Sequence, residues 1–253
     1  MNRRDLLVAV GALLPLRHVD FGLPVQSADH AKPGRPPSAI VFDAYGTLFD
    51  VHSVATLANE LFPGQGEALS QRWRAKQLEY SWTLSLMRRY EDFWNVTDHA
   101  LTFACHALKL SCSASEHQRL MDSYLRLSAF PDASAGLKQA AGTRLAILSN
   151  GSPKMLGAVV SSAGFGGAFT RVISVDEIRV YKPDPRVYQL AVDTLHVQPS
   201  SVLFVSSNAW DVGGAKAFGF RTCWVNRDGV PPEELGLNAD FVVGNLTALP
   251  RTL

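Results

Sequence analysis

Five short apolar runs recur along this sequence, and stretches of helix-forming residues separate the last four of them. The runs cover residues 38–42, 145–148, 172–175, 202–205 and 222–225. Each run has the length of a buried strand, and parallel neighbours in a sheet need a crossover connection, which a helix usually provides. The alternation therefore predicts an α/β fold built on a doubly wound parallel sheet.

One long insertion interrupts this alternation, between the first and second runs. Residues 53–129 form it, and its helix-forming stretches are at 53–61, 67–90, 93–108 and 115–129. We interpret the insertion as a helical cap domain on a Rossmann-like core domain of residues 38–52 and 130–253. A cap that closes over the carboxyl ends of the strands excludes water from a site there.

Residues 1–37 differ in character from the rest of the chain. Arg3 and Arg4 precede an apolar segment at 6–16, and polar, proline-rich sequence follows it. This pattern resembles a twin-arginine export signal, and the apolar segment is shorter than the about 20 residues that span a bilayer. We therefore expect periplasmic localisation with no stable membrane anchor. The alternative is an unstructured extension or an incorrect start codon, which would leave the protein cytoplasmic.

The composition points to a small-molecule ligand. The formal net charge is +1, 47% of the residues are hydrophobic and 19% are charged, and no long basic run is present. Such a chain has no overall field that would attract nucleic acid or an anionic membrane. Its three cysteines, Cys105, Cys112 and Cys223, show no C-x-x-C spacing, so we predict neither a disulfide framework nor a zinc site.

Asp43 directly follows the first apolar run and precedes a turn that contains Gly46. Ligands of open α/β sheets bind beyond the carboxyl ends of the strands, so this carboxylate would face a bound small molecule as a nucleophile. Lys182 precedes a proline, and the restricted backbone there allows its ammonium group to point at Asp43 and keep that carboxylate ionised. The alternatives are a turn-capping role for Asp43 and a solvated loop position for Lys182.

Polar side chains also follow the second and fourth apolar runs. Ser149 and Asn150 come just before a helix expected to begin near Pro153, and the free N–H groups of a helix start favour an anion such as a substrate carboxylate. Asp211 follows the fourth run and supplies a second carboxylate. The alternative for these polar residues is simple helix capping.

The segments around these residues resemble the motifs of the haloacid dehalogenase superfamily. They read D-x-Y-G-T-L-F-D at 43–50, K-P-D-P-x-x-Y at 182–188 and S-N-A-W-D at 207–211. Phosphatase members usually carry acids at the positions of Tyr45 and Asn208. A phenol with an ordinary pKa near ~10 is a poor general acid, and one carboxylate fewer weakens a magnesium site. The resemblance therefore implies a dehalogenase that uses no metal and no cofactor.

The stretch W-R-x-K-Q-L-E-Y at 73–80 resembles the cap helix of L-2-haloacid dehalogenases, and the resemblance extends over residues 39–225. It implies hydrolysis of L-2-haloalkanoic acids to D-2-hydroxy acids and halide through an ester on Asp43, the activity of an (S)-2-haloacid dehalogenase. It also implies a homodimer. Ala75 stands where the family often has glutamine, which makes the pocket less polar, and an export signal is unusual in the family.

The resemblance implies a role for each matched residue. The catalytic set is Asp43, Thr47, Arg74, Ser149, Asn150, Lys182, Tyr188, Ser206, Asn208 and Asp211. The substrate-binding set is Tyr45, Arg74, Leu78, Phe93, Ser149, Asn150 and Trp210. Arg74 with Asn150 would stabilise the departing halide, and Asp211 with Lys182 would orient the water that attacks the ester.

Two other functions are compatible with parts of this pattern. A small-molecule phosphatase of the same superfamily would require magnesium. A noncatalytic periplasmic binding protein for small carboxylic acids would keep the pocket but would not need Asp43, Lys182 and Asp211 together. An assay of halide release separates the three functions.

The export hypothesis predicts that replacing both Arg3 and Arg4 by lysine retains the protein in the cytoplasm. The export receptor reads the arginine pair, and the short apolar segment that follows is a poor anchor by itself. Fractionation of cells that express each form measures the periplasmic yield. Equal yields from the two forms would reject the twin-arginine assignment.

Overall fold

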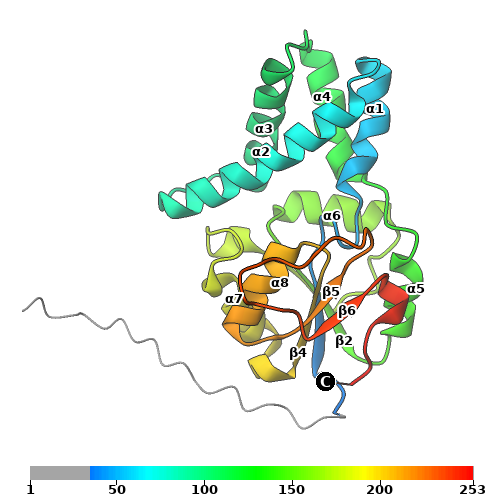
Figure 1. Cartoon of the computed structure of the whole chain (residues 1–253), viewed down its shortest axis with the longest axis vertical. Coiled ribbons are helices and arrows are strands. Elements are labelled where there is room, and N and C mark those ends of the chain that lie inside the picture. Colours follow the sequence, from blue (N-terminus) through cyan, green and yellow to red (C-terminus); the bar gives the residue numbers. More distant parts are fainter. Residues whose placement is uncertain (1–34, 253) are drawn as a thin grey trace, which may run out of the picture.

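The computed structural model describes residues 35–252, and at its centre is a six-stranded sheet (Figure 1). All neighbouring strands are parallel, in the order β3-β2-β1-β4-β5-β6. The strands are β1 (Ala39–Phe42), β2 (Arg144–Ser149), β3 (Arg171–Ser174), β4 (Val202–Ser206), β5 (Arg221–Val225) and β6 (Phe241–Val243). The predicted doubly wound parallel sheet is therefore confirmed. The predicted export signal, with Arg3 and Arg4, lies outside the described residues.

The sixth strand was not predicted. It has three residues at the edge of the sheet, and although all three are apolar, the run is shorter than those that predicted the other strands. The residue before the strand, Asp240, fixes its position. The Asp240 carboxylate accepts from Thr222 N in β5 at 2.9 Å and from Lys216 Nζ in the last α-helix at 2.7 Å. A contact between distant residues therefore determines this edge, and a local sequence window does not contain it.

The register of the central strands brings their carboxyl ends to one edge of the sheet. Phe42 pairs with Ile147 in β2 and with Val205 in β4. These strands are buried on both faces, which agrees with their continuous apolar runs. The polar residues that follow β1, β2 and β4 consequently emerge beside one another.

Four helices flank the sheet: α5 (Ala133–Gln139), α6 (Pro153–Ser162), α7 (Pro185–Leu195) and α8 (Ala209–Phe218). Figure 1 shows α7 and α8 on one side of the sheet and α5 on the other. Pro153 and Pro185 each occupy a first helical position, where the missing N–H costs no helical hydrogen bond. Short 3-10 helices are η1 (Val51–Ser53), η2 (Tyr124–Arg126), η3 (Val175–Glu177), η4 (Pro199–Ser201) and η5 (Leu246–Ala248).

The insertion between β1 and β2 forms four helices above the sheet (Figure 1). They are α1 (Val54–Leu61), α2 (Gly66–Leu86), α3 (Phe93–Ala107) and α4 (Ala114–Ser123). Two of them are shorter than the sequence suggested. The second ends before Arg88, which has a left-handed φ of 55°, and the fourth ends at Ser123 and passes into η2. The division of the chain into signal, core and cap stays a prediction.

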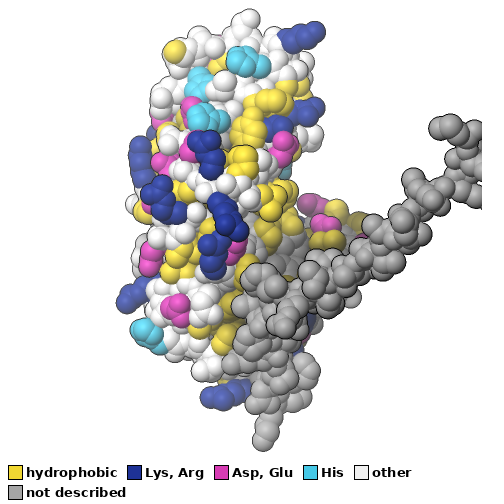
Figure 2. All heavy atoms as spheres, turned by 90° about the vertical axis from the view of Figure 1, so that its left-hand side faces the viewer, with side chains coloured by type: hydrophobic (Ala, Val, Ile, Leu, Met, Phe, Trp, Pro, Cys, Tyr) yellow, Lys and Arg dark blue, Asp and Glu magenta, His cyan; other side chains and the backbone are white. Residues whose placement is uncertain are grey.

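The described surface is mixed in charge. Figure 2 shows Lys and Arg side chains interspersed with Asp, Glu and apolar side chains over one face, with several basic groups near its middle. Between residues 35 and 252, no helix combines the length and the apolar character that crossing a bilayer demands. Cys105, Cys112 and Cys223 are free thiols.

Candidate active site

The Asp43 carboxylate lies at the carboxyl end of β1 and is 5% exposed. Its backbone N–H donates to Val205 O at 2.9 Å, which continues the pairing of β1 with β4 past the end of the strand. Oδ1 accepts from Lys182 Nζ at 3.0 Å. Oδ2 accepts from Thr47 Oγ1 at 3.0 Å and from Asn208 Nδ2 at 2.8 Å. Both oxygens are therefore fixed in direction.

The Lys182 ammonium group lies between two carboxylates. Besides Asp43 it donates to Asp211 Oδ2 at 2.8 Å, and its side chain is 1% exposed. Burial by itself lowers the pKa of Lys182, but the nearby Asp211 and Asp43 carboxylates outweigh it and raise that pKa. The lysine therefore carries a positive charge at neutral pH. Asn150 Oδ1 accepts from the Lys182 backbone N–H at 3.0 Å and fixes the main chain that presents this side chain.

The second carboxylate, Asp211, is fully buried in the first turn of α8. The pKa of Asp211 lies above its ordinary value. Burial raises it and outweighs the Lys182 charge and the hydrogen bond from Tyr188, which act in the opposite direction. The Tyr188 hydroxyl donates to Asp211 Oδ1 at 2.8 Å. A Cβ atom at Gly214 would collide with that hydroxyl and with the Pro183 ring, so only glycine leaves room for this contact.

Hydroxyl and amide groups fix the turns after β1 and β4 to each other. Thr47 Oγ1 accepts from Ser207 N at 2.9 Å, which leaves its proton free to donate to Asp43. Ser206 Oγ accepts from Asn208 N at 3.1 Å and lies 3.4 Å from Thr47 Oγ1. These contacts position the two donors that hold Asp43 Oδ2.

Arg74 brings a cation from helix α2 of the insertion to the same place. Its guanidinium donates to Gln77 Oε1 at 2.7 Å through Nη1 and approaches Tyr45 O at 3.4 Å through Nη2. The same Tyr45 carbonyl accepts from Asn208 Nδ2 at 3.0 Å. This carbonyl therefore joins Arg74 to the Asn208 amide, which also donates to Asp43. Arg74 is 9% exposed, and across the described chain no carboxylate lies within ion-pair distance of it. Burial lowers its pKa.

Aromatic rings form the apolar wall beside Arg74. The Tyr45 ring lies 6.1 Å from Phe93 and 6.3 Å from Tyr124, measured between ring centroids. The buried Tyr45 hydroxyl has no hydrogen-bond partner within the described part of the chain. A Cβ at Gly151 would lie 2.6 Å from the Tyr45 ring, so glycine is needed for the ring to pack there. Trp210 meets the cap through Trp82, at 5.4 Å between centroids.

The structure brings most of the predicted catalytic residues into one hydrogen-bonded network. The connected side chains are those of Asp43, Thr47, Lys182, Tyr188, Ser206, Asn208 and Asp211. Asn150 supports Lys182 through the backbone, and Ser149 Oγ accepts from Gly151 N at 3.1 Å and so shapes the adjoining turn. Leu78 is half-buried on α2, one turn beyond Arg74. The catalytic and binding roles of these residues stay predictions.

Other supporting residues were not predicted. Gln77 binds Arg74, and Arg227 donates to Thr47 O at 3.0 Å, to Ser207 Oγ at 2.7 Å and to both oxygens of Asp132 at 3.0 Å. Arg227 follows β5 and lies in no recognisable motif, so its sequence context carried no signal. Gln77 lies within the 73–80 stretch, where its spacing of three residues from Arg74 on a helix was the available signal.

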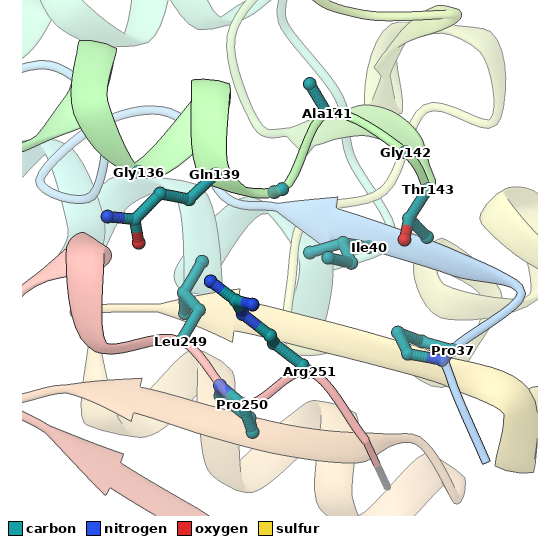
Figure 3. Close-up of a pocket in the computed structure, with 11 residues that line it drawn as sticks. Pro37, Ile40, Gly136, Gln139, Ala141, Gly142, Thr143, Leu249, Pro250 and Arg251 are labelled. Carbon is teal, nitrogen blue, oxygen red and sulfur yellow. The ribbon is translucent and has the colours of Figure 1, made fainter.

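A cavity of about 260 Å³ lies at the opposite edge of the sheet (Figure 3). Pro37 and Thr143, which precede β1 and β2, line it together with Leu249 and Arg251. It contains no carboxylate and lies at the amino ends of strands whose carboxyl ends carry Asp43 and its partners. It is therefore separate from the candidate active site. Within residues 35–252, no group of three His, Cys, Asp or Glu side chains is placed to hold a metal ion.

Comparison with known proteins relates this geometry to a family. A family model described as haloacid dehalogenase-like hydrolase matches residues 37–219. The chain is 52% identical over 213 residues to an (S)-2-haloacid dehalogenase of Pseudomonas sp. (strain YL), covering 83% of this chain and 91% of that protein. It is 47% identical over 213 residues to haloacetate dehalogenase H-2 of Moraxella sp. (strain B), covering 83% and 95%.

Solved structures give the same relationship. An L-2-haloacid dehalogenase from Xanthobacter autotrophicus with chloropropionic acid covalently bound is 44% identical, with a TM-score of 0.79. The alignment covers 83% of this chain and 96% of that one. The family match from 37 to 219 includes β1, the four helices of the insertion and α8, and hence every residue of the network around Asp43. The chain belongs to the haloacid dehalogenase-like hydrolase family.

Proposed function

We propose that the protein is an (S)-2-haloacid dehalogenase, which hydrolyses L-2-haloalkanoic acids to D-2-hydroxy acids and halide. The observation that carries this proposal is the buried Asp43 carboxylate beside Lys182, with Tyr45 where a phosphatase would carry its second acid. The relatives named for the same reaction support it. The haloacetate dehalogenase among the relatives suggests that short substrates are also accepted.

The first step is attack by Asp43 Oδ1 on C2 of the substrate. Oδ2 already accepts from Thr47 and Asn208, whereas Oδ1 accepts only from Lys182, so Oδ1 is the oxygen with a lone pair to offer. A bond forms between Oδ1 and C2 while the bond from C2 to the halogen breaks from the opposite side. The halide leaves with the bonding electrons, and the configuration at C2 is inverted.

Arg74 stabilises the departing halide. Its guanidinium keeps its charge, is mostly desolvated and has no carboxylate neighbour within ion-pair distance in the described chain, so an incoming anion is its missing counter-ion. The unpartnered Tyr45 hydroxyl is available to donate to the same ligand. The Tyr45 and Phe93 rings supply the apolar surroundings that the alkyl part of the substrate needs.

The second step is hydrolysis of the ester on Asp43. Water attacks the carboxyl carbon, and negative charge develops on Oδ2, where Thr47 and Asn208 already donate. Asp211, aligned by Lys182 and Tyr188, accepts a proton from that water. Collapse of the tetrahedral intermediate breaks the bond between the carboxyl carbon and Oδ1, and the leaving oxygen takes up the proton that Asp211 had accepted, which releases the hydroxy acid. The second proton of the water leaves to solvent and returns Asp43 as a carboxylate.

The proposed function predicts chloride release from L-2-chloropropionate by the purified protein in the presence of a chelator. Ion chromatography measures the halide, and a panel with both enantiomers and haloacetates defines the range of substrates. Generic phosphate esters serve as the comparison and should not be hydrolysed, because Tyr45 cannot replace an acid at that position. Magnesium-dependent phosphatase activity without halide release would favour the phosphatase, and binding without turnover would favour a binding protein.

The covalent step predicts where oxygen-18 from labelled water goes in a single turnover with excess enzyme. Water attacks the Asp43 carboxyl carbon, so the label should stay in the Asp43 carboxylate while the hydroxy acid takes an unlabelled oxygen from the protein. Mass spectrometry of the Asp43 peptide and of the product measures both. Label in the first-turnover product and none in the peptide would overturn the ester mechanism, because it would make Asp43 a general base.

Compartment and assembly are further parts of the proposal. Arg3 and Arg4 before a short apolar segment support export to the periplasm.

A homodimer through the long helices of the insertion is supported by exposed apolar side chains on and beside these helices, at Leu86, Met87 and Phe103. Sedimentation analysis should give twice the mass of one chain, and a monomer at micromolar concentration would contradict this assembly.

A further inference from the structure

We propose that Gln77 is a positioning residue that holds the Arg74 guanidinium in place and leaves its charge free for the halide. This inference rests on the proposed function, because it assigns Arg74 to halide stabilisation. Gln77 Oε1 accepts from Arg74 Nη1 at 2.7 Å, and both residues lie on α2, three positions apart. Gln77 is fully buried, so its amide makes no contact with solvent.

A hydroxyl on the neighbouring helix α3 determines which way the Gln77 amide faces. Thr97 Oγ1 donates its only proton to Phe93 O at 2.6 Å. Towards Gln77 it can therefore only accept, and it accepts from Gln77 Nε2 at 2.7 Å. The carbonyl oxygen of Gln77 must then point the other way, towards Arg74. The chain of contacts thus runs from the α3 backbone through Thr97 and Gln77 to the guanidinium.

The contact surface between the two helices keeps this chain of contacts rigid. Trp73, next to Arg74, donates from Nε1 to Thr97 O at 2.8 Å. Trp73, Gln77 and Thr97 are all fully buried. The backbone of Thr97 and its side chain therefore each hold one residue of α2, on either side of Arg74.

A neutral acceptor suits this position better than a charged one. Glutamate has the same shape as glutamine, but its carboxylate would pair with Arg74 and compete with a halide for the guanidinium. It would also lack the N–H that Thr97 accepts. Glutamine accepts one guanidinium hydrogen and adds no charge, so the cation keeps its attraction for an anion. The residue type at 77 therefore affects the affinity for the leaving group as well as the packing of the cap.

The test compares Gln77→Glu, Thr97→Val and Arg74→Lys with the wild type. Gln71→Glu is the matched control, because it makes the same chemical change on the exposed face of the same helix. We expect Gln77→Glu and Arg74→Lys each to slow ester formation about 10- to 1,000-fold and to weaken inhibition by bromide at least about tenfold. Thr97→Val should act in the same direction with a smaller effect, and Thr97→Ser should restore the wild-type values.

Two readouts separate positioning from a merely structural role. The ratio of single-turnover rates for 2-bromo- and 2-chloropropionate should change in Gln77→Glu, because the poorer leaving group depends more on Arg74; a loss of packing would slow both equally. Bromide binding, measured by titration calorimetry, reports on the guanidinium without turnover. It therefore tests the inference even if the wild type releases no halide, which would be a failure of the proposed function alone.

One set of results would overturn the inference. It is a folded Gln77→Glu protein, shown by an unchanged circular dichroism spectrum, whose bromide affinity and rate ratio stay within about twofold of the wild type. If Gln77→Glu does not fold, Thr97→Val decides, because it removes one hydroxyl and keeps the shape of the side chain. Wild-type bromide binding by Thr97→Val would then reject the relay from α3.

Discussion

The Lys182 ammonium group between Asp43 and Asp211 is the interaction on which the rest of the site depends. The ammonium nitrogen lies 3.0 Å from Asp43 Oδ1 and 2.8 Å from Asp211 Oδ2, and removing the lysine would leave two buried carboxylates with no cation beside them. The carboxylates come from the end of β1 and the start of α8, and the lysine from the loop before α7. The relative positions of these three elements are therefore constrained by electrostatics as well as by packing.

The parallel sheet makes this arrangement possible. Because β1 and β4 run in register, the turns that follow them lie side by side and can exchange hydrogen bonds through Thr47 and Asn208. Arg227 adds a third tie by reaching from the end of β5 to both turns. In the proposed reaction, Asp43 is the nucleophile and is held by these neighbours before any substrate arrives, which lowers the reorganisation needed.

The insertion contributes a cation of a different kind. Lys182 is balanced by two carboxylates, whereas Arg74 is held by the carbonyl groups of Gln77 and Tyr45 and keeps its charge. The group at the end of β1 therefore has two carboxylates for one lysine, whereas α2 supplies a cation that has no carboxylate partner in the described chain. The buried Thr97 and Gln77 link Arg74 to the packing of α2 on α3, so under the proposed function this packing affects the halide site.

The sequence by itself determined the class of the sheet, the five longer strands and most of the charged and polar groups at their carboxyl ends. Apolar runs, the acid Asp43 at a strand end and the lysine Lys182 before a proline are local patterns, so a single sequence contains them. The tertiary structure decided the edge strand β6, the end of α2 before Arg88, and the roles of Gln77 and Arg227 in support of the site. Gln77 and Arg227 depend on partners 20 and 180 residues away, Thr97 and Thr47, and no local window records which distant group will satisfy a buried donor or acceptor.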